Sequence, residues 1–495
     1  MKILFINPSI DPTAQDQIWA SALKHDLFGD MSFIPRIAPM VLAAVTPPEH
    51  SFTYLDEDIE ELKFDQIDAD LIAITSMTVQ AVRAYFLADK FRQMGYTVVM
   101  GGIHASSCPE EAATHADAVC TGEAESYWPI LLDDFANNRL KKEYRSKDYP
   151  PVTELVTPKF DIVKHDSYSV LPLQATRGCP YSCDFCCIAF SSGHKYRMKP
   201  VEQVVAEIKA LEQYNQGPFK KRYHFVDDNL YVNRDYTVSL FKALKELKIT
   251  WMGMGSLNTV KDAEVVKLMA ESGCRSYSVG FESISEESLN EVKKKTNQVE
   301  EYITAAQTLI SNGIISAGYF IFGFDQDDEN SFRRTTEFTI KHHIINPFFN
   351  IMTPFPGTQV YERTKDRIFD RNWSHYGSLK CVFTPGKLSP DQLEKGSYWA
   401  SQEVARLDLL REHLEYFWSH GPWETNPRLK FGERMLLLYL SSRMRNNKEY
   451  NKFLKWAAFK RNAVDVYQIA SAVTFHYMAE KFKKGIKLIE ASGNV

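Results

Sequence analysis

Three cysteines of this chain have a spacing that suits a metal cluster. Cys179, Cys183 and Cys186 follow the pattern C-x3-C-x2-C, and Cys187 comes directly after the third. A structural zinc site normally has four Cys or His ligands. Cys187 is a poor fourth ligand, because adjacent side chains rarely reach the same ion, and His194 lies eight residues beyond Cys186. A [4Fe-4S] cluster needs one ligand for each iron. Three thiolates would therefore leave one iron open to a substrate or cofactor.

The cysteines follow the first of six alternating strand and helix patterns. Such a series predicts parallel strands joined by helices, here a (β/α)6 partial TIM barrel over residues 171–388. Chemistry on this fold takes place at the carboxyl ends of the strands, which is where the cysteines fall. The predicted strands are 171–179, 222–229, 250–257, 276–283, 316–324 and 347–357.

The same alternation in residues 1–145 predicts an α/β, doubly wound, Rossmann-like domain. A ligand of such a domain binds beyond the carboxyl ends of its strands. We expect a linker over 146–170, which is irregular, and a helical C-terminal region over 389–495. The predicted strands of the first domain are 2–8, 52–58, 71–77, 97–102 and 118–123.

The cysteine pattern at the end of a first barrel strand resembles that of the radical S-adenosylmethionine (SAM) enzymes. An aromatic residue, Phe185, stands just before the third cysteine, as in that family. The resemblance implies that Cys179, Cys183 and Cys186 ligate a [4Fe-4S] cluster whose open iron chelates SAM, and that Phe185 lies against the adenine. The alternative is a zinc or redox cluster without radical chemistry. The cysteines outside the motif are expected to be packing residues.

The resemblance also implies SAM contacts at the ends of the later barrel strands. Asp227 and Asp228 stand where the family often has a Gly-Gly-Glu stretch that holds the SAM amino group. A carboxylate there can accept from an ammonium. Glu282 is a candidate for the ribose hydroxyls, and Gly318 and Phe320 on the fifth strand are expected beside the adenine. The alternative for the acidic residues is hydrogen bonding at the top of the barrel without a SAM contact.

The first domain is similar to that of the cobalamin-binding radical SAM subfamily. Those proteins share a Gly-Gly-x-His-x4-Pro-Glu stretch followed by a Gly-Glu pair, and this chain has both. Glycines after a strand let the backbone approach a ligand closely. The residues expected to contact cobalamin are Pro8, Ser9, Ser76, Met77, Thr78, Gln80, Gly101, Gly102, His104, Gly122 and Glu123.

One motif of other cobalamin proteins is absent. The Asp-x-His-x2-Gly loop that supplies an axial histidine in the mutases does not occur, and His104 follows the fourth strand, which is the wrong place for that role. We therefore expect no axial histidine from the protein. Two alternatives remain: His104 is a hydrogen-bonding turn residue, or the domain keeps the fold and has lost the cofactor.

The family implies methylation of an unreactive carbon. A 5′-deoxyadenosyl radical would remove a hydrogen atom from the substrate, and the substrate radical would take a methyl group from methylcobalamin. The cobalamin would then be reduced and remethylated by a second SAM. Ring formation, rearrangement or carbon–carbon coupling without methyl transfer is the alternative within the family. A non-catalytic cobalamin sensor is the alternative outside it, but it leaves the three thiolates unexplained. A tRNA-modifying methylthiotransferase would need more cysteines in the first domain.

The C-terminal part of the chain differs in charge from the rest. Residues 421–495 contain 14 Lys and Arg against 6 Asp and Glu, a net charge of +8. The whole chain has a net charge of −5, so residues 1–420 have a net charge of −13. Basic helices with aromatic residues favour anionic membrane surfaces, and the plan is similar to the hopanoid C-2 methylases, which implies an apolar or lipid-like substrate. A helical cap over the barrel explains the same residues equally well. Nucleic acid is disfavoured by the acidic remainder.

Composition places the chain among ordinary globular proteins, with 44% hydrophobic and 24% charged residues. No apolar run approaches the ~20 residues that span a bilayer, and the first residues lack the pattern of a signal peptide. We therefore expect a cytoplasmic protein with reduced cysteines, associated with membranes only if the basic tail binds them. The resemblance implies a small-molecule substrate and an external electron donor of the flavodoxin or ferredoxin type.

Overall fold

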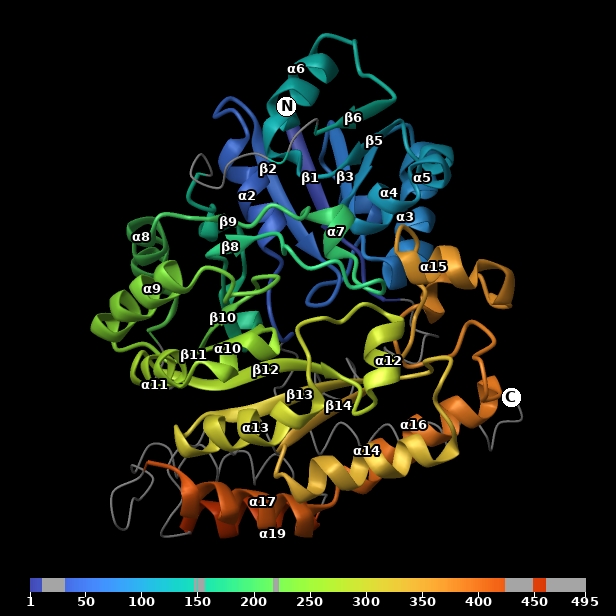
Figure 1. The fold of residues 1–495 in the computed structure, drawn as a ribbon. Coiled ribbons are helices and arrows are strands. Elements are labelled where there is room, and N and C mark those ends of the chain that lie inside the picture. The colour runs from blue at the N-terminus through green and yellow to red at the C-terminus, as the bar shows by residue number, and fades with distance from the viewer. Residues whose placement is uncertain (11–31, 147–148, 150–155, 217–221, 423–447, 460–495) are drawn as a thin grey trace.

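The computed structural model describes residues 1–10, 32–146, 149, 156–216, 222–422 and 448–459. Within them the chain forms two parallel six-stranded sheets that lie one above the other, with a group of helices on the far side of the second sheet (Figure 1). One hydrophobic core extends from Ile3 in the first sheet to Val404 beyond the second, and a separate core packs against the first sheet. The two sheets therefore pack as one body.

The first sheet has the strand order β2-β1-β3-β4-β5-β6, all parallel. The chain passes from β1 to β2 on one side and then to β3 on the other, so β1 and β3 form the switch point where doubly wound sheets bind ligands. The elements are β1 (Lys2–Asn7), α2 (Ile37–Val45), β2 (Ser51–Asp56), η2 (Phe64–Gln66), β3 (Leu71–Thr75), η3 (Thr78–Gln80), α3 (Ala81–Gln93), β4 (Thr97–Gly101), α4 (Gly102–Ser107), α5 (Pro109–His115), β5 (Ala118–Thr121), η4 (Ala124–Ser126), α6 (Trp128–Ala136) and β6 (Glu143–Arg145).

The five predicted strands of this domain are confirmed, and the sixth, β6, was missed. Central strands such as β1 and β3 are buried on both faces and read as continuous apolar runs, because helices cover both sides of a parallel sheet. The edge strand β6 is only three residues long, and the two outer ones are charged. It has too few residues for a periodic pattern to appear.

The second sheet has the order β14-β13-β12-β11-β10-β7 and is also parallel. Its two ends, β7 and β14, do not pair, which makes it the predicted partial barrel. The elements are η6 (Phe160–Ile162), η7 (His165–Ser167), β7 (Val170–Leu173), β8 (Thr176–Arg177), α7 (Ile188–Ser191), β9 (Arg197–Met198), α8 (Val201–Leu211), η8 (Glu212–Tyr214), β10 (Arg222–Phe225), α9 (Arg234–Leu247), β11 (Trp251–Gly255), α10 (Leu257–Lys261), α11 (Ala263–Glu271), β12 (Cys274–Glu282), α12 (Glu286–Glu291), η9 (Val299–Glu301), α13 (Tyr302–Ser311), β13 (Ile315–Phe322), α14 (Glu329–Lys341), β14 (Asn346–Ile351), α15 (Gln359–Thr364), η10 (Lys365–Arg367) and η11 (Trp373–His375).

All six predicted barrel strands are present, but the first is shorter than expected. It ends at Leu173, and the chain then forms the two-residue strand β8, which pairs antiparallel with β9. The cysteine motif lies in the loop between these two short strands. The helices α16 (Pro390–Val404), α17 (Leu407–His420) and α19 (Lys448–Phe459) confirm a helical C-terminal region as far as it is described. Most of the basic segment 421–495 lies outside the described residues.

Candidate active site

The fold holds the cysteine loop at its base and at its tip. The base is the β8–β9 pairing. At the tip, the buried carboxylate of Asp184 accepts from Lys293 and from Arg363, at 3.0 Å each. The backbone N–H of Cys186 donates to the carbonyl of Cys183 at 3.0 Å, so a turn joins these two cysteines. The loop geometry is therefore set by the barrel elements around it.

The three cysteines of the motif line one cavity of about 290 Å³ at the carboxyl ends of the barrel strands. Phe185, Asp228 and Glu282, predicted from the resemblance, line it as well. Cys187 is not among the lining residues, in agreement with its expected exclusion from the ligand set. Further lining residues that the sequence did not single out are Asn229, Ser256, Lys294, Thr296, Tyr319, Ile321 and Asn350.

The charged residues of this cavity act on the thiols in opposite directions: Lys294 favours anionic sulfur, and Asp228 and Glu282 oppose it. Burial raises the pKa of all three thiols, that of Cys186 to about 12. Lys294 opposes this effect, since it lies close enough to lower the pKa of each of them. Burial disfavours the charge of Lys294, but the ion pair with Glu282 opposes this effect, and the pKa of the ammonium is raised. Without iron the thiols stay protonated, and the lysine is charged.

Glu282 has an unusual backbone conformation. It ends β12 with φ of 64°, a left-handed conformation that is uncommon for a residue with a side chain. The pairing with β13 shifts register between Gly280 and Glu282. Backbone strain of this kind gathers at functional sites. Here it accompanies a carboxylate that lines the cavity and accepts from Lys294 at 2.8 Å.

A second cavity, of about 420 Å³, lies at the carboxyl ends of β1, β3, β4 and β5, over the switch point of the first sheet. It is large and mostly apolar, as a site for a flat cofactor should be. The residues predicted to contact cobalamin that line it are Ser76, Met77, Gln80, Gly101, Gly102, Gly122 and Glu123.

One feature of this cavity explains the glycine after β4, and a second fits a bound polar group. Gly102 has φ of 93°, and a Cβ there would come within 2.7 Å of the Ser76 carbonyl oxygen, so that only glycine suits the position. The buried hydroxyl of Ser76 has no hydrogen-bond partner. A buried hydroxyl of this kind is expected to meet a bound group or water. The residues present therefore fit cobalamin.

An ion-pair network joins the first domain to the two short strands that hold the cysteine loop. Glu123 accepts from Arg177 at 3.0 Å and from Arg197 at 2.9 Å, and Arg177 also donates to Glu125 at 2.6 Å. Arg177, two residues before Cys179, also lines the second cavity. The loop that carries the thiols thus forms part of the wall of the cobalamin cavity, which makes the two sites neighbours.

Comparison with known proteins agrees with this geometry. The family model described as "Radical SAM superfamily" matches residues 173–339, and the one described as "B12 binding domain" matches residues 41–132. Bacteriochlorophyllide d C-8(2)-methyltransferase of Chlorobaculum tepidum is 35% identical over 71% of this chain and 81% of its own length. The chain belongs to the cobalamin-binding radical SAM enzymes. The predicted family and enzyme class are confirmed.

Two further matches fit this family. Hopanoid C-2 methylase of Rhodopseudomonas palustris is 24% identical over 69% of this chain and 66% of its own length. The solved structure of the radical SAM methyltransferase TsrM from Kitasatospora setae, with cobalamin and a [4Fe-4S] cluster bound, has a TM-score of 0.64. It is 14% identical and covers 90% of this chain and 99% of its own, so it supports the fold.

Three residues predicted to bind SAM do not line the cluster cavity of this radical SAM enzyme. Asp227 is buried and accepts from the backbone of Ala175 and from the hydroxyl of Thr176, at 3.1 and 2.6 Å, so it holds the start of the cysteine loop. Gly318 and Phe320 lie on the other face of β13, where Phe320 stacks on Phe281. Because strand residues alternate between faces, the cavity is lined by Tyr319 and Ile321 instead.

Four residues predicted to bind cobalamin do not line its cavity. The Pro8 carbonyl accepts from Gln80, and the backbone N–H of Ser9 donates to Glu57. Thr78 lines a third cavity, described below. The fourth residue, His104, is fully buried, and its Nε2 lies 2.9 Å from the hydroxyl of Tyr85. This hydrogen bond agrees with the alternative of a structural histidine.

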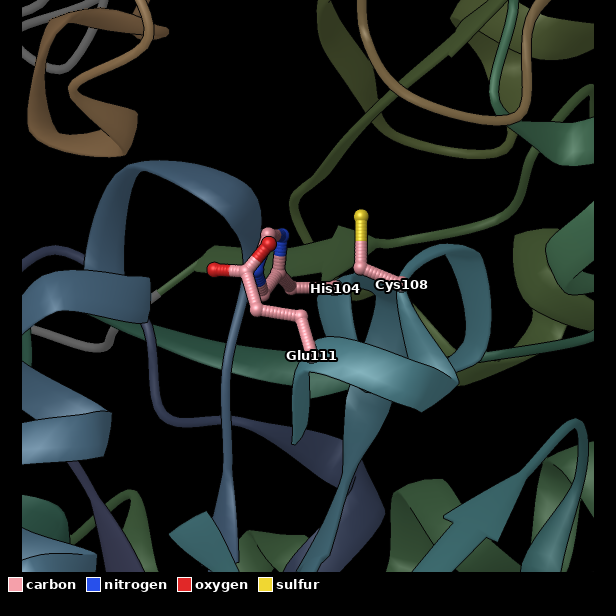
Figure 2. A group of neighbouring side chains, drawn as sticks. All are labelled: His104, Cys108 and Glu111. Carbon is pink, nitrogen blue, oxygen red and sulfur yellow. The ribbon is translucent and has the colours of Figure 1, made fainter. Parts of the chain in front are cut away.

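His104, Cys108 and Glu111 come close enough to consider a metal ion (Figure 2). The surrounding contacts argue against this reading. Trp373 donates to Glu111 at 2.7 Å, and Tyr85 hydrogen-bonds to both Glu111 and His104. Burial raises the pKa of the Cys108 thiol to about 11, so it stays protonated. We interpret the group as a hydrogen-bonded contact between the first domain and the segment after the barrel.

Lys294 is a charged residue of the cavity wall that sequence reasoning missed. It lies in a run of three lysines, 293–295, which reads as an exposed basic turn. The structure separates their roles, since Lys293 pairs with Asp184 and Lys294 points into the cavity beside Glu282. Its only sequence signal was its place after the fourth barrel strand, where this fold puts functional side chains.

Proposed function

We propose that this radical SAM enzyme methylates an unactivated carbon of a small molecule with the help of cobalamin. The observation that carries the proposal is the short chain segment that links the two cavities: Arg177 lines the cobalamin cavity and stands two residues before Cys179, which lines the cluster cavity. When bound, the cluster with SAM supplies the hydrogen-abstracting radical, and cobalamin supplies the methyl group. Adjacent sites allow both to reach one substrate carbon.

The chain's own residues have three tasks in this reaction. Cys179, Cys183 and Cys186 hold the cluster and leave one iron open. Asp228, Glu282 and Lys294 offer the charges that an ammonium and a carboxylate of SAM require. The apolar residues in the walls of both cavities hold the reacting groups in place.

The relatives support methyl transfer over other radical reactions. Two of those described above act, by their names, on a bacteriochlorophyllide and on hopanoids, and both are C-methylating enzymes. Ring formation or coupling without methyl transfer remains the second candidate, because anaerobic magnesium-protoporphyrin IX monomethyl ester cyclases also resemble the chain, at 22% identity for that of Rubrivivax gelatinosus.

Two partners belong to the proposal. Each radical needs one electron from outside the chain, which we assign to a flavodoxin or ferredoxin. We also assign a peripheral membrane contact to the basic segment 421–495, because its net charge of +8 suits anionic lipid. Among the described residues, no helix is both long and apolar enough to cross a membrane.

The experiment that tests the function counts metal. The protein is reconstituted anaerobically with iron, sulfide and hydroxocobalamin, desalted and analysed beside a Cys179/Cys183/Cys186 triple alanine variant. We expect about four irons and one cobalt for each chain, and loss of the iron alone in the variant. Iron without cobalt would overturn methyl transfer from cobalamin and favour the second candidate.

A further inference from the structure

A third cavity, of about 390 Å³, opens between the two cofactor sites. It lies among η3 of the first domain, the segment after β14 and the segment after η11. Phe355 and Ser378 line both this cavity and the cluster cavity, and Met77 lines both this cavity and the cobalamin cavity. It is therefore the compartment from which a molecule could reach both cofactors at once.

The walls of the third cavity differ in charge from those of its neighbours. Lys294, Glu282 and Asp228 line the cluster cavity, and Arg36 and Arg177 line the cobalamin cavity with two glutamates. The described residues that line the third cavity include no charged side chain; they are Ile10, Met77, Thr78, Val79, Phe355, Tyr376, Gly377, Ser378 and Leu379.

The polar groups of this wall are few and neutral. The hydroxyl of the buried Tyr376 already donates to the carbonyl of Asp370 at 2.9 Å, so it is not free to bind a ligand. Thr78 and Ser378 offer neutral hydroxyls. A charged group moved from water into such a cavity would lose its hydration without gaining a partner, which is unfavourable. An apolar body would instead gain by leaving water.

We propose that the third cavity binds the uncharged, apolar body of the molecule that is methylated. The inference rests on the proposed function, and it adds the substrate class and the site. Any carboxylate or phosphate of the substrate lies outside this cavity. Leu379, Val79 and Phe355 are its specificity residues, because their side chains supply the apolar wall.

The test measures binding of two probes to the reconstituted holoenzyme by equilibrium dialysis. The probes are radiolabelled pyrene, which is apolar and uncharged, and pyrene-1-carboxylate, which has the same rings and one negative charge. We expect one pyrene for each chain, and binding of the carboxylate at least tenfold weaker. Leu379→Glu and Leu379→Lys should each weaken pyrene binding at least tenfold, because either charge opposes an apolar ligand.

The control variant is Ile130→Glu, which adds a charge at an exposed apolar residue of α6 outside the third cavity and should leave pyrene binding unchanged. Pyrene binding that both Leu379 variants retain, or wild-type binding of the carboxylate as tight as that of pyrene, overturns the inference. If the charged variants lose iron or cobalt, Leu379→Trp replaces them, since it fills the cavity without a charge and should still abolish pyrene binding.

The metal counts on the same samples separate the two proposals. Full iron and cobalt without pyrene binding would overturn only the substrate site. Pyrene binding that depends on Leu379 in a protein that binds no cobalt would overturn methyl transfer and support an apolar-ligand site beside the cluster.

Discussion

The ammonium of Lys294 lies 2.8 Å from the carboxylate of Glu282, inside the cavity that Cys179, Cys183 and Cys186 line. Lys294 is the one cation among the described residues of that wall. Its partner Glu282 is held in a left-handed conformation at the end of β12. The pair places one positive and one negative charge beside the thiols. The sequence around Lys294, a run of three lysines, suggests only an exposed basic turn.

Replacement of Lys294 by Met should weaken SAM binding roughly tenfold or more, because a hydrogen bond to a charged group contributes about 1.5–3 kcal/mol. The measurement is the Kd for SAM by calorimetry on protein with a full complement of iron. Lys294→Arg should restore most of the affinity. Lys295→Met, at the exposed neighbour, is the matched control. Equal SAM affinity in Lys294→Met and wild type would refute the assignment.

Asp227 should make stability depend on pH. Burial raises its pKa to about 7, from an ordinary value of 3.8. The folded protein therefore holds an extra proton between about pH 4 and pH 7, and the contribution of this group to stability is present at low pH and lost as the pH rises through 7.

Urea unfolding of wild type and Asp227→Asn across this range measures the effect. The stability of the variant should improve relative to wild type as the pH rises. Asp235→Asn, at an exposed residue of α9, should show no such trend. A difference between wild type and Asp227→Asn that stays constant with pH would show that Asp227 does not titrate there.

Glu123→Gln should destabilise the junction of the two domains. The carboxylate accepts from Arg177 and Arg197, which are both buried, and its loss removes an anion from each of them, with Glu125 still paired to Arg177. Breaking a buried ion pair in this way costs about 3–5 kcal/mol. Thermal unfolding and cobalamin binding are the measurements. Glu125→Gln, which removes one contact to Arg177, should have a smaller effect, and an equal effect would argue against Glu123 as the centre of the network.

His104→Phe should leave the absorption spectrum of bound cobalamin unchanged, because the side chain does not line that cavity. The unfolding free energy should fall by about 1–3 kcal/mol, since the buried hydroxyl of Tyr85 loses a partner. Gly102→Ala is the contrasting variant. It should weaken cobalamin binding, because a Cβ at φ of 93° meets the Ser76 backbone. A shifted cobalamin spectrum in His104→Phe would restore the reading of His104 as a cofactor contact.

The repeated strand pattern sufficed to predict the fold class, and the cysteine spacing on that pattern indicated the family. Both are local signals: a buried parallel strand reads as an apolar run, and thiolates that share a cluster stand close in sequence. The family resemblance added the two cofactors. The same local signals failed at β6, which is short and polar at an edge.

Side-chain direction and long-range pairing came only from the tertiary structure. Asp227 and Asp228 are neighbours in sequence, yet one anchors the start of the cysteine loop and the other lines the cavity. Phe320 and Tyr319 differ in the same way, because consecutive strand residues face opposite sides. The sequence determined which chemistry this protein can carry out. The packing of distant segments decided which residues line the cavities. Lys294 meets Glu282, and Arg177 meets Glu123, only after the strands and the two domains have come together.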